Sequence, residues 1–162
     1  MTTVVQAKRR AILIFMLNRS GVLNKISMLI RRKMYNVETI TAWTTPQSDI
    51  SRMTLTLRED SDQKVRQVVK QIEKMTEVIS ARELDIDQSF WREVAIVKFL
   101  ADAVILEQLK DAHAFDVLDR QPQEVCVAQI AGTSQMIDAF LQDLGERRVL
   151  EIARSGFTAL EK

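Results

Sequence analysis

The chain has 162 residues, of which 46% are hydrophobic and 28% are charged, and its formal net charge is +1. These values are typical of a folded protein and exclude a disordered one. A net charge near zero provides no overall attraction to nucleic acid or to an anionic membrane. The longest apolar run, residues 11–17, is far too short to span a bilayer, and no small-residue cleavage site follows it. The single Cys126 cannot form an internal disulfide, so we expect a cytoplasmic protein.

Residues 10–17 are predicted to form the first strand. The side chains of residues 11–17 are apolar on both faces of that strand. This pattern is expected where a second layer or a partner covers the side away from the helices. A hydrophobic central strand in a monomer is the alternative. Because each predicted domain is also small, we expect a homodimer formed through the first domains.

A polar loop follows this strand, and its sequence is Asn18-Arg19-Ser20-Gly21. A helix is predicted over residues 21–33. Gly21 allows a sharp turn, and the amides after it lack intrahelical partners. These amides lie at the positive end of the helix dipole, which suits a carboxylate or a phosphate. Considered alone, the loop favours ordinary helix capping over a ligand site.

The remainder of the first half predicts two strands, a helix and a strand, at residues 36–45, 50–58, 61–74 and 77–86. The same order then repeats. Strands are expected at 94–100, 113–119, 125–130 and 147–158, with helices over 102–112 and from Gly132 onward. Each half is a βαββαβ unit. We therefore predict an α+β protein with two tandem ferredoxin-like domains, residues 10–87 and 91–162.

Catalytic and metal-binding patterns are missing from the sequence. It has one histidine, His113, and no cluster with metal-ligand spacing or nucleotide-binding glycines. Asp85 and Asp87 fall near the predicted linker, where solvation is expected instead of acid–base chemistry. We predict no catalytic residue and no metal site in this chain.

RNA binding is a possible function of this fold class, and it requires aromatic side chains on the central strands. The strand residues here, such as Thr54 and Val127, are aliphatic or hydroxylated. The run Arg31-Arg32-Lys33 is interpreted as a solvated helix end, with a track for phosphates and a subunit contact as the alternatives. We expect no nucleic acid and no membrane among the partners.

Two motifs resemble an ACT domain, and more closely the regulatory small subunits of acetolactate synthase. They are Asn18-Arg19-Ser20-Gly21-Val22-Leu23 and Tyr35-Asn36-Val37-Glu38-Thr39-Ile40. Further matches to that family follow in the same order along the chain: Ser51-Arg52-Met53-Thr54, Arg92-Glu93-Val94-Ala95-Ile96-Val97-Lys98, Ala131-Gly132-Thr133-Ser134, Asp138-Ala139-Phe140-Leu141 and Glu151-Ile152-Ala153-Arg154-Ser155-Gly156.

The resemblance implies a non-catalytic subunit that binds and activates the catalytic (large) subunit of acetolactate synthase. That partner makes acetolactate from pyruvate and is expected to hold thiamine diphosphate, Mg²⁺ and FAD, with no cofactor in this chain. The family also confers feedback inhibition by valine, bound between two ACT domains. One wall of the valine site would comprise Asn18, Ser20, Gly21, Val22 and Leu23, and the partner protomer would supply Asn36 and Val37.

These residue types suit an amino acid. The carboxylate would bind amides near Val22 and Leu23, and the ammonium group would bind the side-chain oxygens of Asn18 or Asn36. Val37 and Leu23 would surround the isopropyl group. Nothing in the pattern chooses valine over leucine or isoleucine.

The sequence departs from the family in three places. Met34 stands where the family usually has glycine at a helix end, so the helix is expected to end differently and to move Asn36. Residues 101–120 match poorly, and residues 1–9 are expected to be a frayed extension. The alternative function is a free-standing amino-acid sensor acting on another partner.

Overall fold

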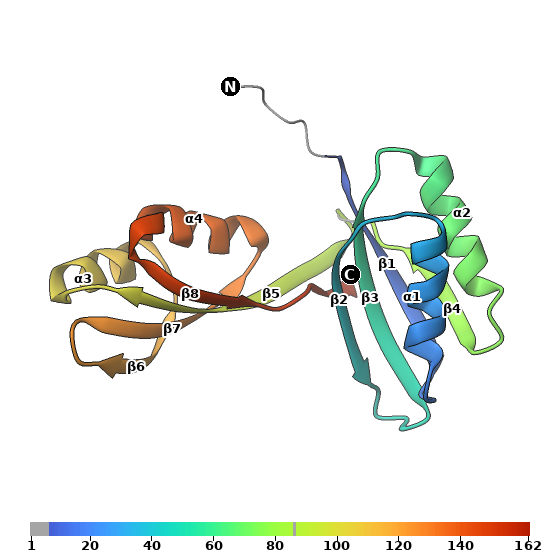
Figure 1. The fold of residues 1–162 in the computed structure, drawn as a ribbon, viewed down its shortest axis with the longest axis horizontal. Coiled ribbons are helices and arrows are strands. Elements are labelled where there is room, and N and C mark those ends of the chain that lie inside the picture. The colour runs from blue at the N-terminus through green and yellow to red at the C-terminus, as the bar shows by residue number, and fades with distance from the viewer. Residues whose placement is uncertain (1–6, 86) are drawn as a thin grey trace. The chain divides into compact units, whose positions relative to one another are not determined.

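The computed structural model describes residues 7–85 and 87–162, which form two compact units. The described residues through Phe90 form the first unit together with Ala159–Lys162, and Trp91–Thr158 form the second. Each unit has an antiparallel sheet and two helices on one face of it (Figure 1). The predicted α+β class with two βαββαβ units is confirmed.

The first unit follows the predicted order of elements. Its sheet has the strand order β2-β3-β1-β4, and every neighbouring pair is antiparallel. The elements are β1 (Arg9–Leu17), α1 (Val22–Arg32), β2 (Val37–Thr44), β3 (Ile50–Arg58), α2 (Asp62–Glu73) and β4 (Val78–Glu83). The strand predicted over 77–86 therefore ends at Glu83, and residue 86 lies outside the described residues.

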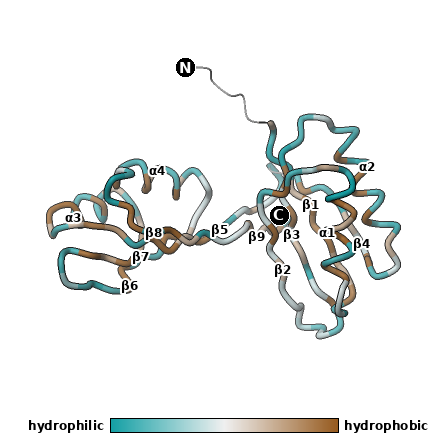
Figure 2. Tube along the Cα trace, viewed as in Figure 1, coloured by the Kyte–Doolittle hydropathy of each residue, from teal (hydrophilic) through white to brown (hydrophobic). Residues whose placement is uncertain are grey.

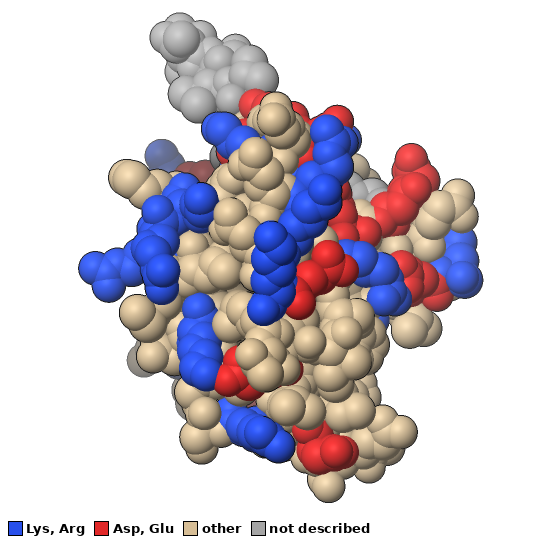
Figure 3. Space-filling model, turned by 90° about the vertical axis from the view of Figure 1, so that its right-hand side faces the viewer, with Lys and Arg blue, Asp and Glu red and all other residues tan. Residues whose placement is uncertain are grey.

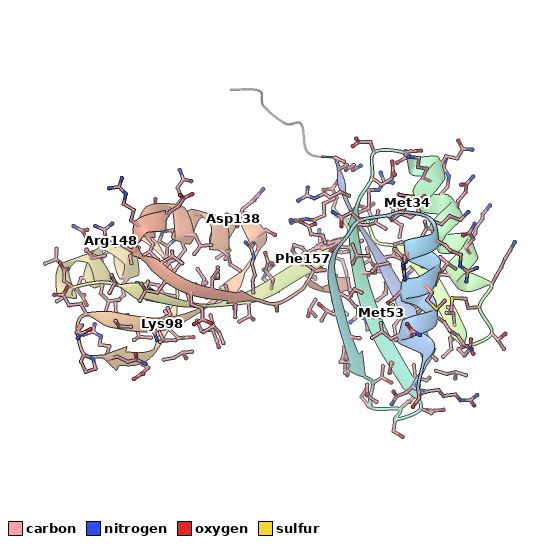
Figure 4. The ribbon with its side chains drawn as sticks, viewed as in Figure 1. Met34, Met53, Lys98, Asp138, Arg148 and Phe157 are labelled. Carbon is pink, nitrogen blue, oxygen red and sulfur yellow. The ribbon has the colours of Figure 1, made fainter. Side chains whose placement is uncertain are left out.

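The core of the first unit lies between its sheet and its helices. Alternate residues of β1 and β3 belong to this core, as the period of two along a strand requires. Figure 2 colours the chain by hydropathy, and Figure 4 labels Met53, one of these residues. The helices contribute residues at three- and four-residue spacing. The buried members are Ile12, Ile14, Met16, Val22, Ile26, Ile30, Met53, Leu55, Leu57, Val65, Val68, Ile72 and Ala81.

The opposite face of this sheet is covered in part by the chain's own C-terminus. Leu13 and Phe15 lie on this face, opposite Arg82 and Arg52 on the neighbouring strands. Arg52 donates a hydrogen bond to the carbonyl oxygen of Ala159, and Arg82 forms an ion pair with Glu161. These two residues belong to β9 (Thr158–Glu161), which pairs with β5 (Ser89–Leu100). The doubly apolar β1 is therefore explained within one chain, and it no longer argues for a dimer.

Residues 7–9 are held in place instead of frayed. The Lys8 amide donates to Asp60 Oδ1 at 2.8 Å, and the Glu59 amide donates to the Lys8 carbonyl oxygen at 3.0 Å. The extension was predicted over residues 1–9, and residues 1–6 lie outside the described part. The prediction of fraying is wrong for residues 7–9 because these bonds extend the β1–β3 pairing.

The second unit repeats the architecture with the strand order β6-β7-β5-β8. Its elements after β5 are α3 (Ala103–Ala112), β6 (Asp116–Gln121), β7 (Val125–Gly132), α4 (Ser134–Leu144) and β8 (Val149–Arg154). Phe99 and Phe140 pack edge to face in its core, with ring centroids 6.0 Å apart. No helix in the described part of the chain is long and apolar enough to cross a membrane.

The strand predicted over residues 147–158 is divided into β8 and β9, so that prediction is wrong in its extent. Ser155 interrupts it. The Val94 amide donates to Ser155 Oγ at 2.9 Å, and Ser155 Oγ donates to the Gly156 carbonyl oxygen at 3.0 Å. The Ser155 hydroxyl thus accepts the hydrogen bond that a backbone carbonyl oxygen would accept in an uninterrupted strand pair, and the strand ends there.

Candidate effector site

The loop between β1 and α1 turns at Gly21. This residue adopts φ 85° and ψ −10°, a left-handed conformation that is strained for residues with a Cβ atom. A Cβ atom built at Gly21 would meet nothing within 4 Å, so space is open on that side. The Val22 amide donates to the Arg19 carbonyl oxygen at 3.3 Å, which closes the turn. Backbone conformation, and not crowding, therefore favours glycine here.

No side chain caps the N-terminus of α1. The other three α-helices are capped by Ser61, Asp102 and Thr133, each of which accepts a hydrogen bond from a first-turn amide. In α1 the capping position is Gly21, which has no side chain, and Ser20 does not take over. The loop therefore caps the helix through the backbone of Gly21, without the side-chain hydrogen bond that capping by a polar residue provides. The first-turn amides after Gly21 remain at the positive end of the helix dipole.

Asn18 ties this loop to the turn between β2 and β3. Its side-chain Nδ2 donates to the Ser48 carbonyl oxygen at 2.9 Å, and its backbone amide donates to the Asp49 carbonyl oxygen at 2.7 Å. The side-chain nitrogen therefore has a structural role. The Oδ1 atom has no partner among the described residues and is the atom suited to accept from an ammonium group.

The far end of α1 closes around Met34, which adopts φ 57°. The Met34 amide donates to the Arg31 carbonyl oxygen at 3.0 Å, and the Tyr35 amide donates to the Ile30 carbonyl oxygen at 3.4 Å. This pair of bonds is the Schellman motif, in which glycine usually occupies the left-handed position. The expectation that the helix ends differently without glycine is wrong, because Met34 adopts the conformation that glycine would have.

Asn36 and Val37 line a groove beside this helix end. The groove has a volume of about 710 Å³ and lies between α1 and β2. The sequence analysis did not assign three of its apolar residues, Ile30, Met34 and Ile40. The sequence contains a partial signal for them, since Ile40 ends the family-like motif that begins at Tyr35, and Met34 directly precedes that motif. The full lining is Ile26, Ser27, Ile30, Arg31, Met34, Tyr35, Asn36, Val37, Ile40 and Leu55.

Within one chain, the two predicted walls lie at opposite ends of α1. The helix has 11 residues, so its ends are about 16 Å apart. The Asn18 side chain lies near Thr44 at the end of β2, with Nδ2 and Oγ1 3.5 Å apart, whereas Val37 begins that eight-residue strand. The structure brings Asn18, Ser20, Gly21, Val22 and Leu23 together at one end, and Asn36 and Val37 at the other. A single copy does not assemble both walls.

Strand β2 is an edge strand of its sheet. It presents exposed apolar side chains, with Ile40 41% and Trp43 49% exposed. A long edge strand of this kind is normally covered by a further strand, a helix or another chain.

Near the start of β2, Glu38 accepts hydrogen bonds from Arg9 and Arg58. The bond from Arg9 contributes most to holding the Glu38 pKa below its usual value.

His113 lies in a different unit from Asp85 and Asp87. His113 lies in the second unit, where its Nε2 is 2.8 Å from Asp143 Oδ2 and its ring packs on Phe140. Asp85 and Asp87 are exposed, and the Asp87 amide donates to Asp85 Oδ1 at 2.8 Å. Among residues 7–85 and 87–162, no group of three or more His, Cys, Asp or Glu side chains is placed to hold a metal ion.

Two family models match the chain. Residues 12–80 match the acetohydroxyacid synthase (AHAS) small subunit-like ACT domain, and residues 92–162 match the small subunit of acetolactate synthase. The first match contains both predicted walls. The second spans the part of the chain in which residues 101–120 departed from the family pattern.

Individual proteins match over nearly the whole chain. The acetolactate synthase isozyme 3 small subunit of Salmonella typhimurium is 33% identical over 159 residues, which cover 95% of this chain and 96% of the relative. The acetolactate synthase small subunit of Bacillus subtilis is 29% identical over 95% of this chain and 91% of its own. The crystal structure of the acetolactate synthase small subunit from Thermotoga maritima superimposes with a TM-score of 0.86, at 25% identity, over 96% of this chain and 98% of that one.

Proposed function

We propose that this chain, which belongs to the family of acetolactate synthase small subunits, activates an acetolactate synthase catalytic subunit and confers feedback inhibition by valine. It would be a regulatory subunit without catalytic residues. Thiamine diphosphate, Mg²⁺ and FAD would be held by the catalytic subunit, and this chain would act on that enzyme through binding.

The observation that carries the effector proposal is the uncapped start of α1 behind Gly21. The Val22 amide is bonded to Arg19, but the Leu23 and Asn24 amides of this turn can donate to a carboxylate, and the helix dipole favours its charge. Asn18 Oδ1 can accept from the ammonium group of the same amino acid. Leu23 is 45% exposed beside these groups and can pack against an aliphatic side chain. Carboxylate, ammonium and aliphatic side chain are the three parts of valine.

The second wall would come from another copy of the chain. Asn36 and Val37 follow the far end of α1, a helix about 16 Å long whose other end is the Gly21 turn, so we expect them to reach that turn only from a partner. The open edge of β2 and the apolar groove beside α1 offer a surface for such pairing. A two-fold homodimer formed there would repeat each contact twice and would create two identical sites.

The test is reconstitution with the catalytic subunit of the same organism. We expect the chain to raise the rate of acetolactate formation, and added valine to suppress that increase. In the absence of the catalytic subunit, valine should raise the melting temperature by mass action, and more than alanine or glutamate does. A thermal response to valine without activation of the enzyme would indicate a free-standing sensor. The absence of both activation and a thermal response to valine would contradict the proposal.

A further inference from the structure

A second groove lies on the helical face of the first unit, between α1 and α2. It has a volume of about 520 Å³. Its floor is apolar, formed by Met28, Leu29 and Met75, and Met28 is 49% exposed. It lies on the flank of α1 that faces α2, where Gln71 and Lys74 line it, whereas the groove that contains Asn36 lies on the flank that faces β2.

The rim of this groove is basic. Lys25, Arg32, Lys33 and Lys74 line it, and only Lys25 has an ion-pair partner among the described residues, namely Glu77. Arg32, Lys33 and Lys74 thus have no acidic ion-pair partner among the described residues. Figure 3 shows this side of the molecule, where Lys and Arg side chains are separated by uncharged surface and by some acidic side chains. Such a local excess is notable in a chain with a net charge of only +1.

We propose that the α1–α2 groove is a docking surface for an acidic, amphipathic segment of the catalytic subunit. This inference rests on the proposed function. A trough between two helices fits the apolar face of a third helix, and methionine side chains adapt to varied apolar partners. Carboxylates flanking that apolar face would pair with Arg32, Lys33 and Lys74, which supply the charge complementarity.

A nucleic acid is the other class of partner that a basic rim attracts. The groove does not favour one, because none of its lining residues is aromatic and its floor is apolar. Single strands bind by stacking bases on aromatic side chains beside a cationic track. The combination of an apolar floor and separated cations fits an amphipathic protein segment better.

Helix α1 contributes to both the proposed effector site and the docking groove. The first turn of α1 forms the proposed carboxylate site, and Lys25 and Arg32 on the same helix line the groove. Both sites therefore lie on one helix of 11 residues. An effector that shifts the N-terminus of α1 would therefore also shift one wall of the docking groove, which couples the two sites through a single element.

The experiment compares two doubly charge-reversed variants of the full chain. In Arg32→Glu/Lys74→Glu both changes lie on the groove rim. In Arg66→Glu/Lys110→Glu the same change in charge is made at two exposed residues outside it. Affinity for the catalytic subunit is measured at two salt concentrations. We expect a loss of about tenfold or more for the rim variant, together with a weaker salt dependence, and little change for the control.

Two further measurements test the apolar contribution to docking and the integrity of the effector site. Met28→Ala should weaken binding of the catalytic subunit without any change in charge, and the valine-induced thermal shift of the rim variant should match that of the wild type. Equal affinities of the rim variant and the control would overturn the inference while leaving activation intact. The inference would also be overturned if the rim variant lost binding to a labelled single-stranded oligonucleotide but bound the catalytic subunit as the wild type does. A wild-type chain that binds no catalytic subunit would remove the proposed function, and this inference with it.

Discussion

The Tyr35 amide donates a hydrogen bond to the carbonyl oxygen of Ile30, at 3.4 Å, and this bond closes the end of α1 around Met34. Met34 is held at φ 57° and is 91% exposed, so it adopts this conformation without burial of its side chain (Figure 4). A residue with a Cβ atom in this region carries roughly 1–3 kcal/mol of strain. The position of Asn36 therefore depends on a strained residue.

Met34→Gly should stabilise the first unit by about 1 kcal/mol. The relief of strain is larger than the added backbone entropy of glycine in the unfolded chain, which is roughly 0.5–1 kcal/mol. Urea unfolding, followed by the fluorescence of Trp43 in a Trp91→Phe background, reports on this unit. A midpoint that falls, with an unchanged slope against urea, would show that Met34 is not strained.

The sequence predicted the element order because the apolar spacing is local and strong. Val65, Val68 and Ile72 at helical spacing specify α2, and alternation around Met53 and Leu55 specifies β3. The end of α1 was predicted less well. A single residue's preference for φ, worth about 1 kcal/mol, was outweighed by two backbone hydrogen bonds and by the packing of Ile30.

Pairings between distant residues were beyond the sequence pattern. Nothing local to Thr158–Glu161 indicates that β9 lies on the first sheet, where Arg52 and Arg82 bind it. The candidate site shows the same limit. Its residues were identified by their resemblance to a family, but the separation of Gly21 from Asn36 along α1 became evident only once the fold was known.

Gly21→Asp should abolish the response to valine while the chain still activates the catalytic subunit. Its Cβ atom meets open space, and aspartate tolerates the left-handed region better than most residues, so the unit should fold. The added charge would repel the valine carboxylate by about 3–4 kcal/mol at 4–5 Å with an effective dielectric constant near 20. Calorimetry of valine binding should then show a loss of a hundredfold or more.

Gly21→Asn is the matched control for this charge. It has nearly the same shape and the same tolerance of a positive φ, but it is neutral. It should retain most of the valine affinity. Full inhibition by valine in the folded aspartate variant would place the effector site elsewhere on the chain.

Arg154 fixes α4 to the sheet of the second unit. It donates to buried Glu93 through Nε at 3.0 Å and Nη2 at 2.6 Å, and to Asp138 through Nη1 at 2.7 Å. The hydrogen bond with Glu93 contributes most to raising the Arg154 pKa. Arg154→Met would leave the Glu93 carboxylate buried without a partner, and we expect a loss of roughly 2–3 kcal/mol in stability.

The double variant Glu93→Gln/Arg154→Met separates the ion pair from simple loss of packing. It removes the unpaired charge and should recover at least half of the loss, because the two residues are coupled. Trp91 fluorescence in a Trp43→Phe background follows this unit. Strictly additive losses would show that the pair does not interact.

Glu38 should make the first unit sensitive to acid. Its pKa is lowered in the fold, so its contribution is fully present above its ordinary pKa of 4.5 and is lost as the pH falls through the lowered value. Glu38→Gln should therefore be less stable than wild type by roughly 0.5–1 kcal/mol at neutral pH. The difference should shrink below pH 4.5. A difference that stays constant on acidification would show that the ion pairs with Arg9 and Arg58 contribute nothing.

The central claim is that one effector site is built from two chains, and complementation between two defective variants tests it most directly. Gly21→Asp disables one wall, and Asn36→His disables the other. Each variant alone should bind no valine. When the two are unfolded together and refolded, each mixed dimer should contain one site with both walls intact.

Isothermal titration calorimetry of the refolded mixture is the deciding measurement. Valine binding should return at the wild-type affinity, with a reduced number of sites, whereas each variant refolded alone should show none. A mixture that binds no more valine than its two components would contradict the shared site, and it would mean that any effector site lies within a single chain.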